Sequence, residues 1–196
     1  MMNKIDEKKD NPTVEQLEKE LERVRYNKRY GSTLRSTVYT LITVAAVAVL
    51  VATLLLPVLQ IFGSSMTPTL VDGDLVVSVK EAGFKQKDVI AFYYNNKILV
   101  KRVIASEGEW IDIDKEGNVF VNGVALDEPY VMDKALGECD IELPYQVPEG
   151  RVFVMGDHRS VSVDSRSSTV GCVAEEQIVG KLVLRIWPLN SFGAIN

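Results

Sequence analysis

The chain has 196 residues, 46% of them hydrophobic, and a formal net charge of −5 at pH 7, which is enough material for one substantial core or two modest lobes. Residues 1–35 hold nine basic and seven acidic side chains, a charge of +2, and the remaining residues hold thirteen and twenty, a charge of −7. Such an acidic remainder argues against a nucleic-acid partner, because nucleic-acid binding requires a basic surface.

The N-terminal segment, residues 1–35, is predicted to start disordered and to continue as a short helix. Residues 1–12 lack the apolar side chains that would offset the entropy cost of ordering. Thr13 and Gln16 then have the spacing of a capping box. An apolar seam with 3-4 spacing follows, formed by Val14, Leu17, Leu21 and Val24. This helix is either simply solvated or takes part in weak self-association or partner docking.

A long apolar stretch comes next. Residues 36–71 contain no charge, and residues 38–59 are almost wholly apolar, close to the ~20 residues with which a helix crosses a bilayer. We predict a transmembrane anchor over 36–60, with Pro57 near its outer end. The alternatives are a buried core helix, which rarely lacks a polar face for so long, and a cleavable export signal, whose apolar core is shorter.

The flanking charges predict the orientation of this anchor. The first charged residue after the stretch is Asp72, whereas five cations lie shortly before it: Arg23, Arg25, Lys28, Arg29 and Arg35. Positive charges favour the cytoplasmic side. We therefore expect a single-pass protein of the cell membrane, in contact with the lipid bilayer, with a cytoplasmic N-terminus and an extracytoplasmic domain over 61–196.

Short apolar runs separated by turn residues follow the anchor and predict strands. The predicted strands cover 75–79, 89–94, 98–104, 110–113, 119–121 and 152–155. The strands 110–113 and 119–121 are expected to form a hairpin, closed by a further turn at Asn122 and Gly123. No βαβ alternation occurs. The predicted fold class is therefore mainly β: an antiparallel sheet or barrel-like domain preceded by one N-terminal transmembrane helix.

Few residues are available for metal or disulfide chemistry. His158 is the only histidine, so a metal site built from several imidazoles is excluded, and a serine-histidine mechanism would have to use it. Cys139 and Cys172 are the only cysteines, and they do not have metal-ligand spacing. They are either bridged or two unlinked small side chains.

The segment 63–70, GSSMTPTL, directly follows the apolar stretch. Gly63 and Pro68 shape the backbone on either side, so Ser65 could be presented at the end of the span. Most serines in turns only hydrogen-bond to nearby backbone groups. Ser65 is therefore either a nucleophile or a turn residue whose hydroxyl only bonds to nearby backbone groups.

Two adjacent cations interrupt the strand predicted over 98–104. Since neighbours in a strand face opposite ways, Lys101 shares the side of Leu99 and Val103. Such a lysine reaches solvent, pairs with a carboxylate, or is buried and loses its charge. Burial among apolar groups can lower its pKa by several units from about 10.4, which would make neutral Lys101 a general base.

A third segment, 155–166 (MGDHRSVSVDSR), is dense in polar groups just after a predicted strand. Such density suits a loop whose shape is fixed by Asp and Arg pairs. The alternative is a solvated turn whose surface ion pairs contribute little stability.

In this order and behind one membrane span, the three segments resemble the signature motifs of the bacterial type I signal peptidase family. One such motif arises easily by chance, whereas the ordered set is specific. The resemblance covers 63–195 and includes GDLVV at 73–77, VNG at 121–123, EPY at 128–130, IVGK at 178–181 and WPL at 187–189.

The resemblance implies a Ser-Lys peptidase. Ser65 would be the nucleophile, its backbone N–H the main donor to the oxyanion, and Lys101 the general base. Ser162 would orient the lysine amine through a hydrogen bond. A set of charged residues would support the site: Asp157, Arg102, Asp164 and Arg166. The chain departs from the family at His158, where many members have Asn, and at Gly63, where some members have a serine that assists the oxyanion.

The implied activity is that of a membrane-bound serine endopeptidase that removes N-terminal signal peptides from exported pre-proteins. It would cleave after small residues, as in A-x-A, and bind the extended substrate as an added strand. The expected partners are these signal peptides, the lipid bilayer and the secretion machinery. No metal or organic cofactor is needed for this chemistry.

Three other functions are compatible with parts of the sequence. Self-cleaving repressors of the DNA-damage response also use a Ser-Lys pair, but they are soluble and carry a DNA-reading domain. A histidine-dependent serine peptidase would rely on His158, although Lys101 occupies the position of the base. A membrane-anchored binding or structural protein could keep the fold without activity.

Overall fold

The computed structural model describes residues 13–80 and 83–195. The chain divides into two compact units, Met1–Val51 and Ala52–Asn196. The disorder predicted for residues 1–12 concerns positions outside the described ones. The boundaries predicted at 36 and 61 stay predictions.

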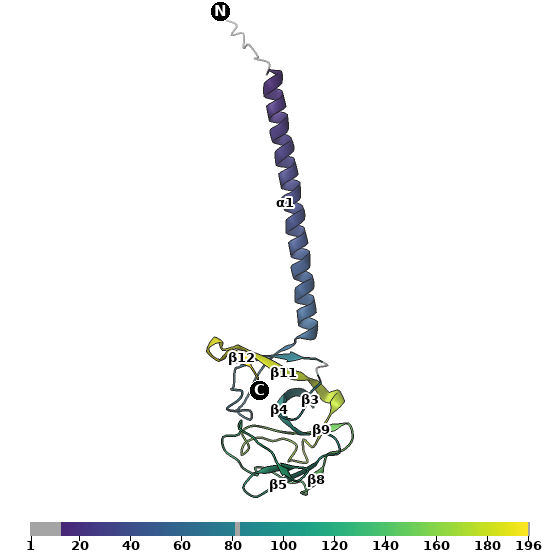
Figure 1. The fold of residues 1–196 in the computed structure, drawn as a ribbon, viewed down its shortest axis with the longest axis vertical. Helices are drawn as coiled ribbons and strands as arrows, with labels where there is room; N and C mark the ends of the chain where they lie inside the picture. Colours follow the sequence, from purple (N-terminus) through teal and green to yellow (C-terminus); the bar gives the residue numbers. More distant parts are fainter. Residues whose placement is uncertain (1–12, 81–82, 196) are drawn as a thin grey trace, which may run out of the picture. The chain divides into compact units, whose positions relative to one another are not determined.

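The first unit is occupied by one long helix, α1 (Val14–Leu55), which is also the only α-helix of the described residues (Figure 1). Thr13 N–H donates to Gln16 Oε1 at 3.0 Å, one half of the predicted capping box. The short helix and the anchor that the sequence predicts separately are continuous, because only Gly31 interrupts the helix-compatible residues between them. The helix ends before Pro57, and it is long and apolar enough to cross a membrane.

The second unit contains two antiparallel sheets. The larger has the order β1-β2-β11-β3-β4-β9-β10, with β12 beside β11, and the smaller has the order β7-β6-β5-β8. The strands of the larger sheet are β1 (Val58–Gln60), β2 (Leu75–Val79), β3 (Val89–Tyr94), β4 (Lys97–Ala105), β9 (Arg151–Met155), β10 (Val173–Ala174), β11 (Ile178–Trp187) and β12 (Gly193–Ala194). Those of the smaller sheet are β5 (Trp110–Ile113), β6 (Val119–Val121), β7 (Val124–Ala125) and β8 (Tyr145–Gln146). Two 3-10 turns, Glu175–Gln177 and Leu189–Ser191, flank β11.

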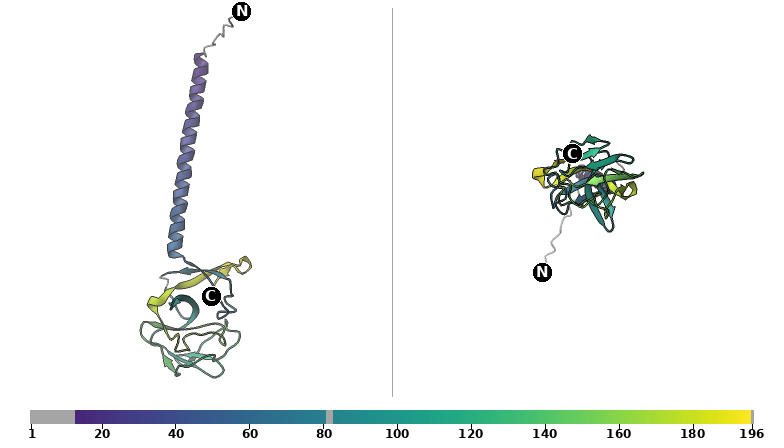
Figure 2. Two further views of the ribbon diagram at one scale, coloured as in Figure 1. Left: turned by 180° about the vertical axis from the view of Figure 1, so that it is seen from behind. Right: turned by 90° about the horizontal axis from the view of Figure 1, so that it is seen from below.

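The mainly β, antiparallel fold class predicted from the sequence is confirmed. The strands β2, β3, β5 and β6 have the predicted bounds, and β4 and β9 extend the predicted runs by one or two residues. The sheets of the described chain do not close into a barrel, since β1 and β10 end the path of the larger sheet. Within this unit, β11 and β12 lie at the opposite end from β5 and β8 (Figures 1 and 2).

The predicted hairpin and its closing turn are present. Strand β5 pairs with β6, and β6 pairs with β7 across Asn122 and Gly123. Both turn residues have positive φ, 52° and 78°, as a type I′ turn requires. Only glycine and asparagine-like residues adopt this conformation at low cost, which explains why this dipeptide closes the hairpin.

The larger sheet buries apolar side chains on both faces. One cluster contains Val76, Ala91 and Leu182, and the other contains Ile90, Phe92, Val103 and Val154. A third cluster joins the two sheets through residues such as Ile111 and Phe153. Because side chains alternate along a strand, consecutive residues of β4 enter different environments. This alternation places the two cations of β4 on opposite faces.

Candidate active site

The candidate nucleophile lies in a chain of tight turns between β1 and β2. Thr67 N–H donates to Ser64 O at 3.2 Å, and Leu70 N–H donates to Met66 O at 2.9 Å. The side chains of Met66 and Leu70 are buried in the core, which fixes the segment against the sheet. Ser65, next to the buried methionine, is left half-buried at the surface.

The structure brings the two predicted catalytic residues together. Lys101 Nζ lies 2.8 Å from Ser65 Oγ, in hydrogen-bond contact, although 36 positions separate them in the sequence. Lys101 pairs with Ile90 across β3 and β4, on the face that also carries Val103. Only 4% of Lys101 is exposed. The sequence-based expectation of an inward lysine beside Leu99 and Val103 therefore describes its position correctly.

Burial changes the acidity of this amine. It lowers the pKa of Lys101 from 10.5 to about 8. Asp164 raises the pKa, Arg166 lowers it, and Asp157 raises it again, but burial is the largest of these effects. With a pKa near 8, roughly one amine in ten is neutral at pH 7 and able to accept a proton, against a very small fraction for an exposed lysine.

The backbone of Ser65 carries the N–H that the resemblance assigns to the oxyanion, a role that stays a prediction. Its carbonyl oxygen accepts a hydrogen bond from His158 N–H at 3.1 Å. Its own N–H donates to no group within residues 13–80 and 83–195, and so is free for a ligand. Gly63 has a φ of 88° and no side chain to contribute. The predicted oxyanion donor is thus available, without a side-chain donor at position 63.

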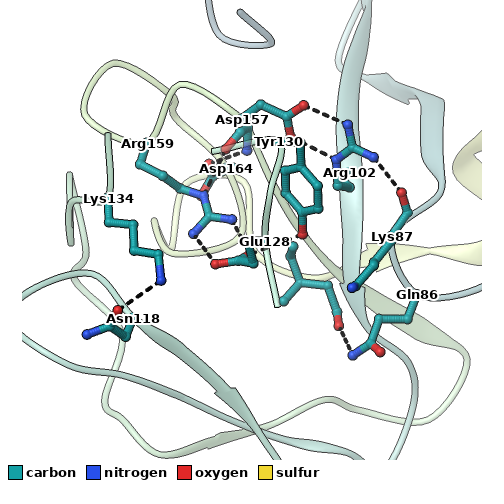
Figure 3. Close-up of polar contacts among 12 residues, drawn as sticks. Gln86, Lys87, Arg102, Asn118, Glu128, Tyr130, Lys134, Asp157, Arg159 and Asp164 are labelled. Atoms are coloured by element: carbon teal, nitrogen blue, oxygen red, sulfur yellow. Dashed lines mark hydrogen bonds and ion pairs between the residues drawn. The ribbon is translucent and has the colours of Figure 1, made fainter. Parts of the chain in front are cut away.

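A bidentate ion pair lies on the opposite face of β4 from the lysine. Arg102 Nε donates to Asp157 Oδ1 at 2.9 Å, and its Nη2 donates to Asp157 Oδ2 at 2.7 Å (Figure 3). The guanidinium also donates to Lys87 O at 2.6 Å and lies 3.9 Å from the centre of the Tyr130 ring. Both members of the pair are fully buried, so its partners are fixed in place.

The second predicted pair is equally buried. Arg166 Nε and Nη2 contact Asp164 Oδ1 and Oδ2 at 2.8 and 2.9 Å. Asp164 also accepts Gly156 N–H at 2.9 Å. Although burial opposes ionisation, the Arg166 guanidinium and these hydrogen bonds hold the pKa of Asp164 below its usual range. The interpretation of segment 155–166 as a loop shaped by Asp and Arg pairs describes it better than a solvated turn does.

Ser162 does not make the contact expected of it. Its side chain is 2% exposed, and its Oγ makes no hydrogen bond of regular geometry among the residues that the structure describes, although it lies close enough to the Asp164 carboxylate to help lower the pKa of that group. The hydroxyl packs against Gly156, where any side chain would overlap it. The orienting hydrogen bond to Lys101 therefore stays a prediction, although Ser162 lies beside the turn that contacts Ser65.

A third buried ion pair joins Arg159 to Glu128, and the sequence alone predicted no role for either residue. Arg159 Nη1 donates to Glu128 Oε2 at 3.1 Å, and Nη2 contacts Glu128 Oε1 (Figure 3). Arg159 Nε also donates to Gly156 O at 3.1 Å, and Tyr130 O–H donates to Glu128 Oε1 at 3.1 Å. Both residues lie in segments that the family resemblance includes, but the sequence does not tell which carboxylate an arginine meets across 31 positions.

A groove of about 670 Å³ leads to the Ser-Lys pair. Its walls are the segments 59–66 and 96–101, and most of its lining is apolar, including Ile61, Phe62 and Leu99. Residues 97–101 of β4 pair with β3 on one side, whereas pairing with β9 begins only at Arg102. This part of β4 therefore has an unpaired edge along the groove.

The remaining candidates for metal or redox chemistry form no site. Among residues 13–80 and 83–195 there is no cluster of three or more His, Cys, Asp or Glu side chains that could hold a metal ion. Cys139 and Cys172 are both free thiols, and burial raises the pKa of Cys172 to about 11. The His158 ring contacts Thr67 Oγ1 at 3.1 Å and makes no hydrogen bond to Ser65 Oγ.

The resemblance implies a serine and a lysine in contact, and the structure has this contact between Ser65 and buried Lys101. The sequence comparisons identify the same family. The family model described as signal peptidase, peptidase S26, matches residues 34–187. The chain belongs to the signal peptidase family, peptidase S26. The identification made from the three sequence segments is thereby confirmed, and the chain is a peptidase of the hydrolase class.

Individual relatives of this family differ in length. Signal peptidase IB of Staphylococcus aureus (strain COL) is 37% identical over 150 residues, which are 66% of this chain and 77% of that protein. Thylakoidal processing peptidase 1 of Arabidopsis thaliana, a chloroplast protein, is 34% identical over 163 residues, or 74% of this chain. The match spans 46% of the Arabidopsis protein.

A solved structure of the same family is also similar. A signal peptidase I from Enterococcus faecalis V583 is 30% identical, with a TM-score of 0.43. The match covers 52% of this chain and 97% of the Enterococcus chain.

Proposed function

We propose that this chain is a membrane-bound serine endopeptidase that removes N-terminal signal peptides from exported pre-proteins, cleaving after small residues of the A-x-A type. Ser65 is the nucleophile and neutral Lys101 is the general base. The observation that carries the proposal is the 2.8 Å contact between Lys101 Nζ and Ser65 Oγ, made by an amine that is 4% exposed.

The first step follows from the depressed pKa. When Lys101 is neutral, its lone pair accepts the Ser65 hydroxyl proton while Oγ forms a bond to the substrate carbonyl carbon. The negative charge that develops on the carbonyl oxygen is stabilised by a hydrogen bond from the Ser65 N–H, which donates to no group of the described residues. The His158 N–H bond to Ser65 O keeps that peptide unit in place.

Collapse of the tetrahedral intermediate completes acylation. The Lys101 ammonium donates its proton to the leaving nitrogen as the peptide C–N bond breaks, which leaves an ester on Ser65 and a neutral amine. A water molecule then loses a proton to Lys101 and attacks the ester carbonyl. The same proton returns to Ser65 Oγ as the ester C–O bond breaks, and the signal peptide leaves with a new C-terminal carboxyl group that loses its own proton to water, so the enzyme is regenerated without a cofactor.

The groove supports an extended apolar substrate. A peptide lying between 59–63 and 97–101 would pair with the open edge of β4 and add a strand to the larger sheet. Its walls carry Ile61 and Leu99, which suit uncharged side chains close to the scissile bond. Small residues before the cut let the carbonyl carbon approach Ser65 Oγ.

Helix α1 supports the membrane attachment of this activity. Its apolar part is long enough to span a bilayer, and cations precede it. We infer a single-pass protein with a cytoplasmic N-terminus and an extracytoplasmic peptidase unit. Signal peptides are themselves delivered to the membrane by the secretion machinery, which is therefore an expected partner.

The proposal is tested with the full-length chain in detergent and a pre-protein that carries an A-x-A site. Wild type is compared with Ser65→Ala, Lys101→Ala and His158→Ala, and the product is identified by N-terminal sequencing. We expect cleavage after the second alanine by wild type and by His158→Ala, and loss of at least roughly 10³-fold in the other two variants.

Each alternative gives a different pattern. Activity that survives Lys101→Ala and disappears with His158→Ala would show a histidine-dependent peptidase. A folded wild-type chain that binds the pre-protein without cleaving it would show a binding protein that retains the fold.

A further inference from the structure

Thr69 lies in the nucleophile segment, residues 63–70, four residues after Ser65, and makes three polar contacts to other parts of the chain. Its hydroxyl donates to Asp157 Oδ2 at 2.5 Å and accepts a hydrogen bond from Arg102 Nη2 at 3.2 Å. Its carbonyl oxygen accepts a hydrogen bond from Arg185 Nη1 at 3.1 Å. Three elements distant in sequence, β4, β11 and the turn after β9, therefore converge on one threonine.

The turn after β9 holds the nucleophile segment at three points, one of which is the 3.1 Å contact between Thr67 Oγ1 and the His158 ring. His158 N–H donates to Ser65 O, and the neighbouring residue Asp157 accepts the Thr69 hydroxyl. Gly156, the next residue back, packs against Ser65 O so closely that a methyl group there would lie 2.5 Å from that oxygen. Movement of the 156–158 turn relative to the segment would thus displace Ser65 itself.

The base is connected to the same contacts through its neighbour in sequence. Arg102 follows Lys101 in β4, holds Asp157 in a bidentate pair, and donates to Thr69. Starting at Lys101, a closed circuit of contacts runs through Arg102 to Thr69, along the segment to Ser65, and back to Lys101 Nζ. In the described part of the chain, Thr69 is the only member of the nucleophile segment whose side chain forms a hydrogen bond with the Arg102–Asp157 pair.

We propose that Thr69 is a positioning residue, whose hydroxyl bridges the Arg102–Asp157 pair and thereby sets Ser65 Oγ within reach of Lys101 Nζ. This inference rests on the proposed Ser-Lys function. Without the hydroxyl, the buried carboxylate loses a charge-assisted hydrogen bond. Towards the turn, the nucleophile segment then keeps only the His158 N–H bond to Ser65 O, the Thr67 contact with the His158 ring and the packing against Gly156.

The matched test compares Thr69→Val, which keeps the shape and removes the hydroxyl, with Thr69→Ser, which keeps the hydroxyl. Thr169→Val applies the same chemical change at an exposed threonine and is the control. Full-length proteins in detergent are assayed on an A-x-A pre-protein for kcat and KM. We expect kcat of Thr69→Val to fall roughly 10- to 100-fold with KM little changed, and both other variants to resemble wild type.

A second measurement does not depend on cleavage. The protonation of Lys101 is followed by NMR of the lysine side chains across pH, with Lys101→Met assigning the signal. If the segment moves away from the amine, water reaches Lys101, and its titration midpoint rises in Thr69→Val but not in Thr69→Ser. The charged groups that influence this amine, Asp164, Arg166 and Asp157, are present in all variants.

The outcomes separate this inference from the proposed function. A wild-type chain that cleaves nothing contradicts the proposed function, whereas the NMR comparison still decides the role of Thr69. An unchanged kcat and an unchanged midpoint in Thr69→Val would overturn the positioning role, as would a Thr69→Ser variant as impaired as Thr69→Val. A fall in thermal stability alone would show that the hydroxyl only supports the fold.

Discussion

At the scale of single residues, the proposed chemistry depends on Lys101, which is buried without a direct ion pair. Its Nζ contacts a neutral hydroxyl, and the two nearby carboxylates, Asp157 and Asp164, are each held by an arginine. Because those carboxylates are already paired, they raise the pKa of Lys101 less than burial lowers it. A single unpaired carboxylate beside Lys101 would raise its pKa and keep the amine charged at pH 7.

The first prediction concerns the pH dependence of cleavage. The base must be neutral, so kcat/KM should rise with pH, about tenfold per unit below the pKa of Lys101, and level off above about 8. Initial rates on an A-x-A peptide between pH 6 and 10 measure this profile. A rate that is constant over this range would contradict a lysine base.

The second prediction concerns stability. In the unfolded chain Lys101 regains its ordinary pKa of 10.5, so between pH 8 and 10.5 the unfolded state binds more protons and the free energy of unfolding rises with pH. Below pH 8 the folded wild type is destabilised by the full cost of burying a charged amine, about 3 kcal/mol. We expect Lys101→Met to be more stable at pH 7 by up to this amount, and the difference to shrink as pH rises towards 10.5.

Denaturant unfolding of both proteins at pH 7 and pH 10 measures the difference. If Lys101→Met is less stable than wild type at pH 7, the buried amine stabilises the fold instead of destabilising it, and the prediction is wrong.

At the scale of elements, one strand and one turn assemble the site. Strand β4 supplies Lys101 to one face and Arg102 to the other, because successive side chains of a strand alternate. The turn after β9 supplies Gly156, Asp157 and His158, which contact the nucleophile segment through a close approach, a carboxylate and a backbone N–H. Replacing either element would separate groups that are adjacent only in the folded chain.

The third prediction tests the turn. A methyl group at Gly156 would overlap Ser162 Oγ and lie 2.5 Å from Ser65 O, so Gly156→Ala should displace the nucleophile. We expect cleavage to fall by at least roughly 100-fold and stability to fall by about 1–3 kcal/mol. Gly193→Ala, where no atom lies within 4 Å, is the matched control and should behave as wild type. Equal activity of the two variants would exclude the close approach as a constraint.

At the scale of the whole molecule, a long apolar helix and a β unit occur in one chain. The helix α1 is fully exposed in its apolar part, which an aqueous protein does not tolerate without a partner. A bilayer would cover this surface and hold the peptidase unit at the membrane where signal peptides reside.

The fourth prediction tests the orientation. Protease added to intact cells should cleave the chain after residue 60 and leave residues 1–35 protected, because the cations before the apolar stretch favour the cytoplasm. Antibodies against tags at the two ends read the fragments, and permeabilised cells provide the control in which both ends are digested. Digestion of the N-terminal tag in intact cells would reverse the topology.

The sequence by itself determined the local features. Periodicity predicted the bounds of β2, β3, β5 and β6, the pair Asn122 and Gly123 predicted the turn that closes the hairpin, and the ordered motifs predicted the family. It missed the ten-residue strand β11, whose mixed burial gives no clear alternation, and it divided one continuous helix into two. Local propensity and short-range spacing are sufficient where a residue's environment is set by its neighbours in the chain.

The tertiary structure alone decided which groups meet. Ser65 and Lys101 are 36 positions apart, Arg102 and Asp157 are 55 apart, and Thr69 and Asp157 are 88 apart. No local pattern encodes these pairings, because they result from how the strands pack and register across the larger sheet. The same packing buries Lys101, and a pKa that depends on burial cannot be known until the surroundings of the amine are known.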